Sequence, residues 1–213
     1  MADPHKQLAR MPRPAFPAQL TDPATAEELI WRTLARAIND RHHGMHTPGL
    51  IALGADGYPN PRVVTLRRVE PAHRTLICHT DIRSEKVAEI ERNPNIAWLC
   101  YDIRTRLQFR ISATARIERD TPLADEQWGR SALSSRRCYL ASHAPGTPSD
   151  TMMSNIPPHM AGRQPTLEES VPGRPNFAIV VTTALRADVL ELAAEGHRRV
   201  MLTFGGPARW VAV

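Results

Sequence analysis

The chain has 213 residues, of which 42% are hydrophobic and 23% are charged, as in an ordinary globular protein. This length is enough to bury a sizeable core and is typical of a single domain. The net charge of +5 raises the question of a nucleic-acid partner. The basic residues are spread along the chain, however, and aromatic residues make up only 5% of it, so the composition argues against nucleic acid.

The start of the chain lacks an apolar run long enough for a signal peptide, and no window approaches the length of a membrane span. Residues 1–22 are polar and rich in proline, so we expect an extended N-terminal arm followed by one domain over 23–213. The cysteines form no C-x-x-C pair, and Cys78 and Cys100 lie inside apolar runs, which is typical of buried free thiols. We therefore expect a cytoplasmic protein without a membrane partner.

The first regular element is a helix predicted over residues 24–40, because apolar residues recur there at helical spacing. This stripe consists of Leu29, Ile30, Leu34, Ala37 and Ile38. The histidines that follow are His42, His43 and His46. Their spacing resembles no compact metal site, so we expect a solvated loop and no metal.

From Gly49 onward the pattern changes to that of strands. Residues 49–54 and 61–69 flank the dipeptide Asp56-Gly57, a common hairpin turn, so we expect two paired strands. Residues 74–80 predict a third strand. A short helix follows and is stopped by Pro94; its residues expected to face inward are Val87, Ala88 and Ile90.

The second half of the chain adds further strands and an irregular segment. Residues 95–101 and 106–117 predict strands four and five, and residues 121–142 look helical. Two or three more strands are expected between Phe177 and the end. Many short strands with few helices predict a mainly β protein, built as a closed antiparallel barrel with peripheral helices.

Cationic and hydroxyl side chains fall at the ends of the apolar runs in this barrel. They are Arg62, Thr65 and Arg67, followed by Thr80, Arg83, Ser84 and Lys86. Guanidinium groups bind a phosphate dianion through two parallel hydrogen bonds, while hydroxyls and a lysine complete the oxygen shell. A helix that begins near Ser84 also directs free backbone N–H groups at an anion. The alternative explanation is structural, with Arg62 at a solvated strand end and Lys86 on an exposed helix face.

Gln108 lies on the polar side of the fifth predicted strand. Its amide group can both donate and accept hydrogen bonds, which suits the edge of a heterocycle. On the outside of a barrel, the same residue would be an ordinary surface glutamine.

Four blocks of sequence carry a family resemblance, namely R-V-V-T-L-R, H-T-D-I-R-S-E-K, N-P-N-I-A-W-L-C-Y and R-L-Q-F-R. Their order and spacing over residues 49–118 resemble the pyridoxamine 5′-phosphate oxidase-like group of FMN-binding split-barrel proteins. A weaker resemblance continues over 128–139 and 177–199. The resemblance implies a Greek-key split barrel that binds flavin mononucleotide (FMN) at the interface of a homodimer. Because related barrels bind a deazaflavin, the sequence leaves FMN and deazaflavin both open.

The residues expected to bind the flavin are Arg62, Val63, Val64, Thr65, Arg67, His79, Thr80, Arg83, Ser84, Lys86, Gln108 and Arg199. The resemblance implies that a glutamine and the segment G-H-R-R approach one flavin from opposite subunits. In this segment His197 and Arg199 match the family's histidine and arginine, and they are the candidate catalytic residues.

Several positions depart from the family pattern. Glu85 stands where the oxidases usually carry an arginine, and Arg83 is the candidate replacement. Arg67 replaces a lysine, and His79 replaces a tyrosine. The tyrosine, arginine and serine that hold pyridoxal phosphate in the true oxidases have no clear counterpart in this chain.

We therefore expect an FMN-dependent oxidase or reductase that acts on a small substrate, which can be anionic. Pyridoxamine and pyridoxine 5′-phosphate are the first substrates to test. The alternative is a non-catalytic FMN-binding protein that serves as a sensor or a store.

Residues 143–175 show no sustained periodicity and are rich in proline, serine, glycine and methionine. A long irregular stretch inside a domain is either a functional lid or a passive linker. We expect this segment to be a mobile loop, because little of it can be buried to offset the loss of chain entropy on ordering.

Overall fold

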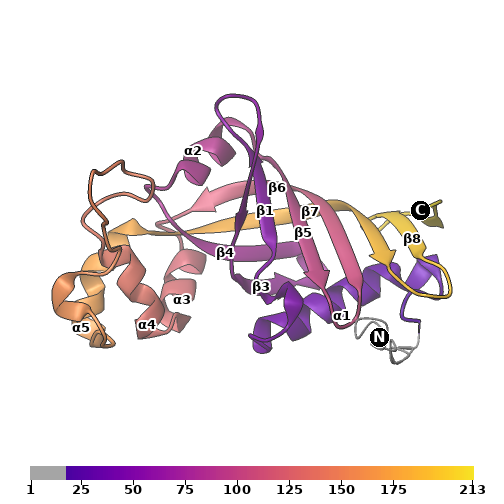
Figure 1. The fold of residues 1–213 in the computed structure, drawn as a ribbon, viewed down its shortest axis with the longest axis horizontal. Helices are drawn as coiled ribbons and strands as arrows, with labels where there is room; N and C mark the ends of the chain where they lie inside the picture. Colours follow the sequence, from indigo (N-terminus) through magenta and orange to yellow (C-terminus); the bar gives the residue numbers. More distant parts are fainter. Residues whose placement is uncertain (1–17) are drawn as a thin grey trace, which may run out of the picture.

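The computed structural model describes residues 18–213, and its strands form one antiparallel sheet (Figure 1). The strands are β1 (Gly49–Leu53), β2 (Pro59–Val63), β3 (Leu66–Glu70), β4 (Thr75–Asp81), β5 (Asn95–Asp102), β6 (Leu107–Glu118), β7 (Phe177–Glu191), β8 (Arg198–Thr203) and β9 (Ala208–Trp210). Their hydrogen-bonded order is β2-β1-β5-β6-β7-β4-β3, with β8 on β7 and β9 on β8. The predicted mainly β fold with peripheral helices is confirmed.

The barrel is split, as the family resemblance implies. The hydrogen-bonded path begins at β2 and ends at β3, and within residues 18–213 no pairing joins these two strands. Residues 61–69, predicted as a single strand, divide at Val64 and Thr65, so that the first half pairs with β1 and the second half with β4. The division follows from topology, because β1 and β4 lie far apart in the order of the sheet.

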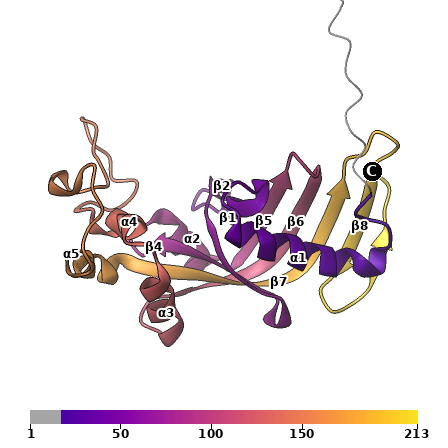
Figure 2. The same ribbon diagram turned by 90° about the horizontal axis from the view of Figure 1, so that it is seen from below.

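Helices cover one face and one end of the sheet. They are α1 (Ala26–Asn39), α2 (Glu85–Arg92), α3 (Pro122–Arg130), α4 (Leu133–Arg136) and α5 (Leu167–Ser170). Figure 2 shows α1 lying across one face of the sheet, while α3, α4 and α5 gather at the end opposite β8. Short 3₁₀ turns extend this helical end at Arg137–Leu140, Pro158–Met160 and Val171–Asn176.

The predicted first helix is confirmed, with Leu29, Ile30, Leu34 and Ala37 all buried. Glu27 lies in its first turn, where a carboxylate stabilises the positive end of the helix dipole. In α2 the expectation for Ala88 was wrong. Ala88 is exposed and its neighbour Glu89 is buried instead.

The first described residues contact the end of β7. Residues 1–17, most of the predicted N-terminal arm, lie outside the described residues. In the remainder, Leu20 is buried, and the backbone N–H groups of Gln19 and Leu20 donate to the carboxylate of Glu191 at 2.9 and 3.0 Å.

The two final strands predicted around 177–183 and 187–192 form one strand, β7, with an irregularity opposite Ser112 and Ala113 of β6.

Two clusters of buried side chains form the core. The larger cluster lies between α1 and the sheet and includes Leu34, Trp98 and Phe109. The smaller cluster lies between α3 and the outer side of β4 and β7; its buried members are Ile77, Ala124, Phe177, Ile179 and Val181. Trp128 and Tyr139 pack against this second cluster, which therefore supports the helical end of the molecule.

Candidate functional site

A cavity of about 940 Å³ lies between the split edge of the barrel and the helical end. One side is formed by β2, β4, the start of α2 and the link between β2 and β3. The predicted flavin-binding residues on this side are Arg62, Val63, Val64, Thr65, Arg67, His79, Thr80, Ser84 and Lys86. The structure therefore brings most of the predicted residues to a single cavity, although they come from three separate stretches of chain, 62–67, 79–80 and 84–86.

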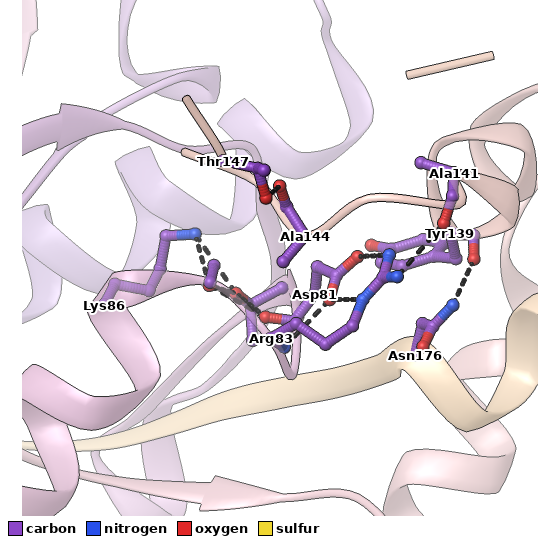
Figure 3. Close-up of polar contacts among 10 residues, drawn as sticks. Asp81, Arg83, Lys86, Tyr139, Ala141, Ala144, Thr147 and Asn176 are labelled. Atoms are coloured by element: carbon purple, nitrogen blue, oxygen red, sulfur yellow. Dashed lines mark hydrogen bonds and ion pairs between the residues drawn. The ribbon is translucent and has the colours of Figure 1, made fainter. Parts of the chain in front are cut away.

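Lys86 and two hydroxyl groups form a compact cluster at the beginning of α2 (Figure 3). The Lys86 ammonium donates to Thr80 Oγ1 at 3.2 Å and to Ser84 Oγ at 3.0 Å. Burial lowers the pKa of Lys86, because a charged ammonium is poorly solvated there. A bound phosphate would favour the charged form again. The cluster is thus suited to an anion.

Arg62 supplies a second cationic group. Its Nη2 donates to Glu89 Oε2 at 2.6 Å, and Asn60 Nδ2 donates to the other oxygen of Glu89 at 2.6 Å. The Nη1 of Arg62 is buried and has no hydrogen-bond partner among the described residues. A buried guanidinium nitrogen without a partner is costly, so an oxygen-rich ligand that reaches this atom would stabilise the site.

The geometry does not support the expected phosphate role of Arg83, which remains a prediction. Its Nε and Nη2 donate to the two carboxylate oxygens of Asp81 at 3.0 and 2.7 Å, and its Nη1 donates to the backbone oxygen of Ala141 at 3.0 Å. Figure 3 shows the side chain folded back against Asp81. Arg83 is absent from the cavity lining, because the nearby carboxylate satisfies its guanidinium first. Its guanidinium instead contacts the start of the irregular segment, at the oxygen of Ala141.

The base of the cavity is aromatic. The ring of His79 meets Phe177 edge-on at 4.9 Å between centroids, and Tyr139 meets Phe177 edge-on at 5.1 Å. Burial lowers the pKa of His79 to about 4, and burial raises the pKa of Tyr139. Both rings are therefore uncharged near neutral pH, and His79 and Tyr139 line the same cavity as the cationic cluster.

His79 should make stability depend on pH. Because its folded pKa of about 4 lies below the ordinary value of 6.5, its contribution is complete above pH 6.5 and is lost as the pH falls toward 4. At pH 5 the loss amounts to about 2 kcal/mol relative to pH 8. We expect His79→Gln to remove this part of the pH dependence in urea unfolding. The control His159→Gln, at an exposed histidine, should retain it, and equal pH dependence in all three proteins would contradict the assignment.

The opposite wall of the cavity is formed by residues 135–155. Its lining includes Ser135, Cys138 and Tyr139 from the end of the helical region, followed by residues of the irregular segment from Ala141 to Asn155. Two contacts fix its beginning: Arg83 holds the oxygen of Ala141, and Asn176 Nδ2 donates to the oxygen of Tyr139 at 2.8 Å (Figure 3).

The irregular segment is partly organised. Residues 143–157 contain no helix or strand, but a 3₁₀ turn buries Met160, and Thr166 and Glu169 form a capping box at the start of α5. Met152, in contrast, is 91% exposed. The mobile lid therefore remains a prediction, and this prediction now applies only to the part of the segment that lines the cavity.

Limited proteolysis tests this lid. We expect a protease of broad specificity to cut first within residues 142–156 of the flavin-free protein, because these residues make few contacts that must break before cleavage. Saturating FMN should slow this cleavage severalfold, since the segment lines the cavity. The exposed loop between β8 and β9 serves as an internal control, and cutting there should be unaffected. Equal cleavage rates in 142–156 with and without FMN would show that the segment is a passive linker.

Gln108, His197 and Arg199 lie away from this cavity. Gln108 on β6 is in register with Leu190 on β7, which is in register with Arg199 on β8. Arg199 donates to both oxygens of Asp188 at 3.0 and 2.8 Å, and the backbone N–H of Ala193 donates to His197 Nδ1 at 3.2 Å. Within one chain they do not join the other predicted residues, so their role as flavin ligands from a second subunit remains a prediction.

Some residues of the cavity were missed by sequence reasoning. Asp81 and Glu85 line it beside the predicted cations, and Ser135, Cys138 and Tyr139 line it from the far side. The sequence places these last three in a helical region without a recognisable motif. The carboxylate of Glu89, which orients Arg62, was missed because its two partners lie in a different element.

The described residues contain no group of three or more histidine, cysteine, aspartate or glutamate side chains placed to hold a metal ion. His43, expected in a solvated loop, is buried beside Asp102, and its Nδ1 accepts a hydrogen bond from the N–H of Met45 at 3.1 Å. Across residues 18–213, no helix is both long enough and apolar enough to cross a bilayer.

Residues 28–119 match the family model of the pyridoxamine 5′-phosphate oxidase FMN-binding domain. A pyridoxine/pyridoxamine 5′-phosphate oxidase of Psychrobacter cryohalolentis is 30% identical over 107 residues, which is 50% of this chain and 49% of the relative. Pyridoxine/pyridoxamine 5′-phosphate oxidase 2 of Arabidopsis thaliana is 26% identical over 172 residues, which is 76% of this chain and 83% of the relative. The match to the Psychrobacter enzyme thus spans about half of its length.

Two solved structures share the fold. A pyridoxamine 5′-phosphate oxidase-related, FMN-binding protein of Nostoc punctiforme superimposes with a TM-score of 0.67 at 19% identity, covering 92% of this chain and 98% of the other. PhzG of Burkholderia lata, solved with tetrahydrophenazine-1-carboxylic acid, gives a TM-score of 0.65 at 19% identity, covering 93% and 97%. The model of the pyridoxamine 5′-phosphate oxidase FMN-binding domain thus matches residues 28–119, and the two solved structures show that the chain shares their split-barrel fold.

Proposed function

We propose that the protein is an FMN-dependent oxidoreductase that acts on a small molecule bound beside the flavin. The observation that carries the proposal is the composition of the cavity. A cluster of cations and hydroxyls, centred on Lys86, lies next to the neutral rings of His79 and Tyr139. A phosphate-bearing flavin needs both features: the cations and hydroxyls suit its phosphate, and the neutral rings suit its uncharged ring system. At about 940 Å³ the cavity is at the upper end of the range for small-molecule sites.

Different residues of the chain have different roles in this proposal. Lys86, Ser84 and Thr80 would hold the phosphate, and Arg62, which is bound by Glu89, lines the same cavity. FMN, when bound, supplies the electron-transfer chemistry. The wall from Tyr139 onward lines the opposite side of the cavity, where it would limit access of water to the flavin. Positioning and exclusion of water are the two contributions that a flavoprotein itself must make.

The absorption spectrum of the purified protein tests the proposal first, with the released chromophore identified by mass. We expect FMN. If the released chromophore is a deazaflavin, the fold assignment stands but the electron-transfer chemistry is different. Anaerobic reduction by candidate donors, followed by mixing with oxygen, then separates an enzyme from a store. Catalytic turnover with any donor supports an oxidoreductase, and a flavin that no donor reduces supports the alternative of a non-catalytic FMN-binding protein. Pyridoxamine and pyridoxine 5′-phosphate are the first donors to test, because the curated relatives carry that activity in their names.

The location of the flavin can be tested through Cys138. This thiol is exposed and lines the cavity, whereas Cys78 and Cys100 are buried, and burial raises the pKa of each to about 12. A maleimide should therefore label one thiol per folded chain, and Cys138→Ser should abolish the labelling. FMN should protect Cys138 from the reagent. Full labelling of the FMN-loaded protein would place the flavin elsewhere.

We expect the protein to be a homodimer. An exposed sheet face carries Leu99, Tyr101 and Met201, which are 43%, 40% and 40% exposed, and the same face carries Gln108 and Arg199. A two-fold interface would bring Gln108 of one subunit and Arg199 of the other to the same flavin. Light scattering should give twice the chain mass, and Leu99→Arg should shift it toward the monomer and weaken FMN binding. A monomer with FMN fully bound would refute this arrangement.

A further inference from the structure

The turn between β4 and α2 makes two sets of contacts. On the cavity side, the Lys86 ammonium donates to the hydroxyls of Thr80 and Ser84. These two hydroxyls in turn donate to the backbone oxygen of Asp81, at 3.1 and 2.8 Å. The backbone N–H of Ser84 donates to the same oxygen at 3.1 Å. The cluster that is suited to a phosphate is therefore joined directly to the backbone of Asp81.

The carboxylate of Asp81 fixes the direction of the Arg83 side chain. Both carboxylate oxygens accept from the guanidinium, at 3.0 and 2.7 Å, and one of them also accepts from the backbone N–H of Arg83 at 2.9 Å. A two-point contact between a guanidinium and a carboxylate sets the plane of the guanidinium. The third nitrogen, Nη1, donates to the backbone oxygen of Ala141 at 3.0 Å (Figure 3). Asp81 thus directs Arg83 to the wall formed by 135–155.

A second chain of hydrogen bonds joins the same turn to the wall. The backbone N–H of Ile82 donates to the oxygen of Asn176 at 2.8 Å, and Asn176 Nδ2 donates to the oxygen of Tyr139 at 2.8 Å. Two carbonyl oxygens at the start of the irregular segment, those of Tyr139 and Ala141, are thus held from one turn. The residues that follow have neither helix nor strand to fix them, so the position of the wall depends on these contacts.

We propose that Arg83 is a positioning residue that ties the wall formed by 135–155 to the phosphate-binding turn, so that binding of the FMN phosphate at Lys86 also orders the wall. The inference rests on the proposed function, because it places FMN in this cavity. A phosphate bound at Lys86 restrains the turn, and the contact from Arg83 then restrains Ala141. A ligand shifts a conformational equilibrium only through contacts that differ between the two states, and here the phosphate supplies that difference. Riboflavin, which has no phosphate, lacks this effect.

Hydrogen–deuterium exchange, read by mass spectrometry of peptides, measures the order of the wall. The full-length protein is compared without ligand, with FMN and with riboflavin, each at a concentration that saturates it. In the wild type, FMN should slow exchange within residues 141–155 about threefold more than riboflavin does. In Arg83→Gln, ligand-free exchange there should be about threefold faster than in the wild type, because one hydrogen bond from a charged donor is lost. Most of the extra slowing by FMN should also be lost.

Arg92→Gln is the matched control. It makes the same substitution at an exposed position at the end of α2, outside the cavity lining, so exchange should match that of the wild type with each ligand. Strands β6 and β7, which pair along most of β6, report on the fold as a whole. Their amides should exchange at the wild-type rate in Arg83→Gln. Faster exchange in β6 and β7 as well as in the wall would mean that Arg83 supports the whole fold, which would count against the inference.

The remaining outcomes separate this inference from the proposal on which it rests. Failure of the wild type to bind FMN would refute the proposed function and this inference with it. Normal FMN binding, with equal slowing of exchange in the wall by FMN and by riboflavin, would overturn the inference alone. Full protection of the wall by saturating FMN in Arg83→Gln would also overturn it. That result, with a loss of affinity for FMN but not for riboflavin, is expected if Arg83 instead binds the phosphate directly.

Discussion

Lys86→Ala should weaken FMN by about tenfold or more and leave riboflavin almost unchanged. The Lys86 ammonium is held by two hydroxyl groups, which fix it at the cationic end of the cavity. A hydrogen bond to a charged group contributes roughly 1.5–3 kcal/mol, equivalent to about one to two powers of ten in affinity. Riboflavin has no phosphate, so it loses nothing at this position. Fluorescence quenching on titration of each ligand measures both dissociation constants.

Arg92→Ala is the matched control for this experiment. Arg92 is the last residue of the same helix and is exposed, so its removal deletes one positive charge without touching the cavity. Its effect on FMN should stay within a factor of two or so, as for a screened surface charge. An equal loss of FMN and riboflavin in Lys86→Ala would show that the residue supports the fold and does not bind phosphate.

Glu89→Ala should lower the free energy of unfolding by about 3 kcal/mol. The side chain is 1% exposed and binds Arg62 and Asn60, one through each carboxylate oxygen. Its removal leaves a largely buried guanidinium, with one nitrogen already lacking a partner, without its counter-charge. Urea unfolding of the FMN-free protein at pH 7.5 measures the change.

Glu91→Ala provides the comparison, because Glu91 lies two residues further along α2 and is exposed. Its substitution should change stability by no more than about 0.5 kcal/mol. Glu89→Gln keeps the shape and one acceptor, so it should fall between the two. Equal stabilities for Glu89→Ala and Glu91→Ala would mean that the buried ion pair contributes nothing to the fold.

The sequence predicted the elements and the cationic end of the site because both depend on local pattern. The alternation from Leu107 to Ala113 marks a strand with one buried face, and all four of its apolar positions are buried. Lys86, Ser84 and Thr80 lie within seven residues of one another, so a strand followed directly by a helix brings them together. This local geometry leaves these three side chains few other relative positions.

Contacts across the fold were harder to predict. Helical spacing places both Ala88 and Glu89 near the edge of the buried face of α2, and apolarity alone favours Ala88. The carboxylate is buried because Arg62 and Asn60 reach it from β2, and no pattern within the helix reveals those partners. The ion pair of Arg83 was missed for a related reason. Its partner Asp81 is only two residues away, but a cation near a phosphate motif suggests a ligand before it suggests an ion pair.

The wall from 135 to 155 shows the limit of sequence reasoning most clearly. Its residues have no periodicity, and their position depends on two anchors, Arg83 and Asn176, from distant parts of the chain. When the position of a segment depends on contacts with distant residues, its own sequence contains no pattern that predicts that position.

The place of β4 in the sheet determines when the site can form during synthesis. This strand carries His79 and Thr80, and its neighbours are β3 and β7, with Thr75 in register with Thr183 and Asp81 with Phe177. Until β7 has left the ribosome, β4 has a hairpin partner on one side only, and Phe177 is missing beneath His79. Pairing between strands far apart in the sequence is slow, and it leaves one edge of β4 exposed until β7 is available. The cavity-lining residues of β4 are therefore made early and assembled late, because the sheet beneath them is complete only after β7 has emerged.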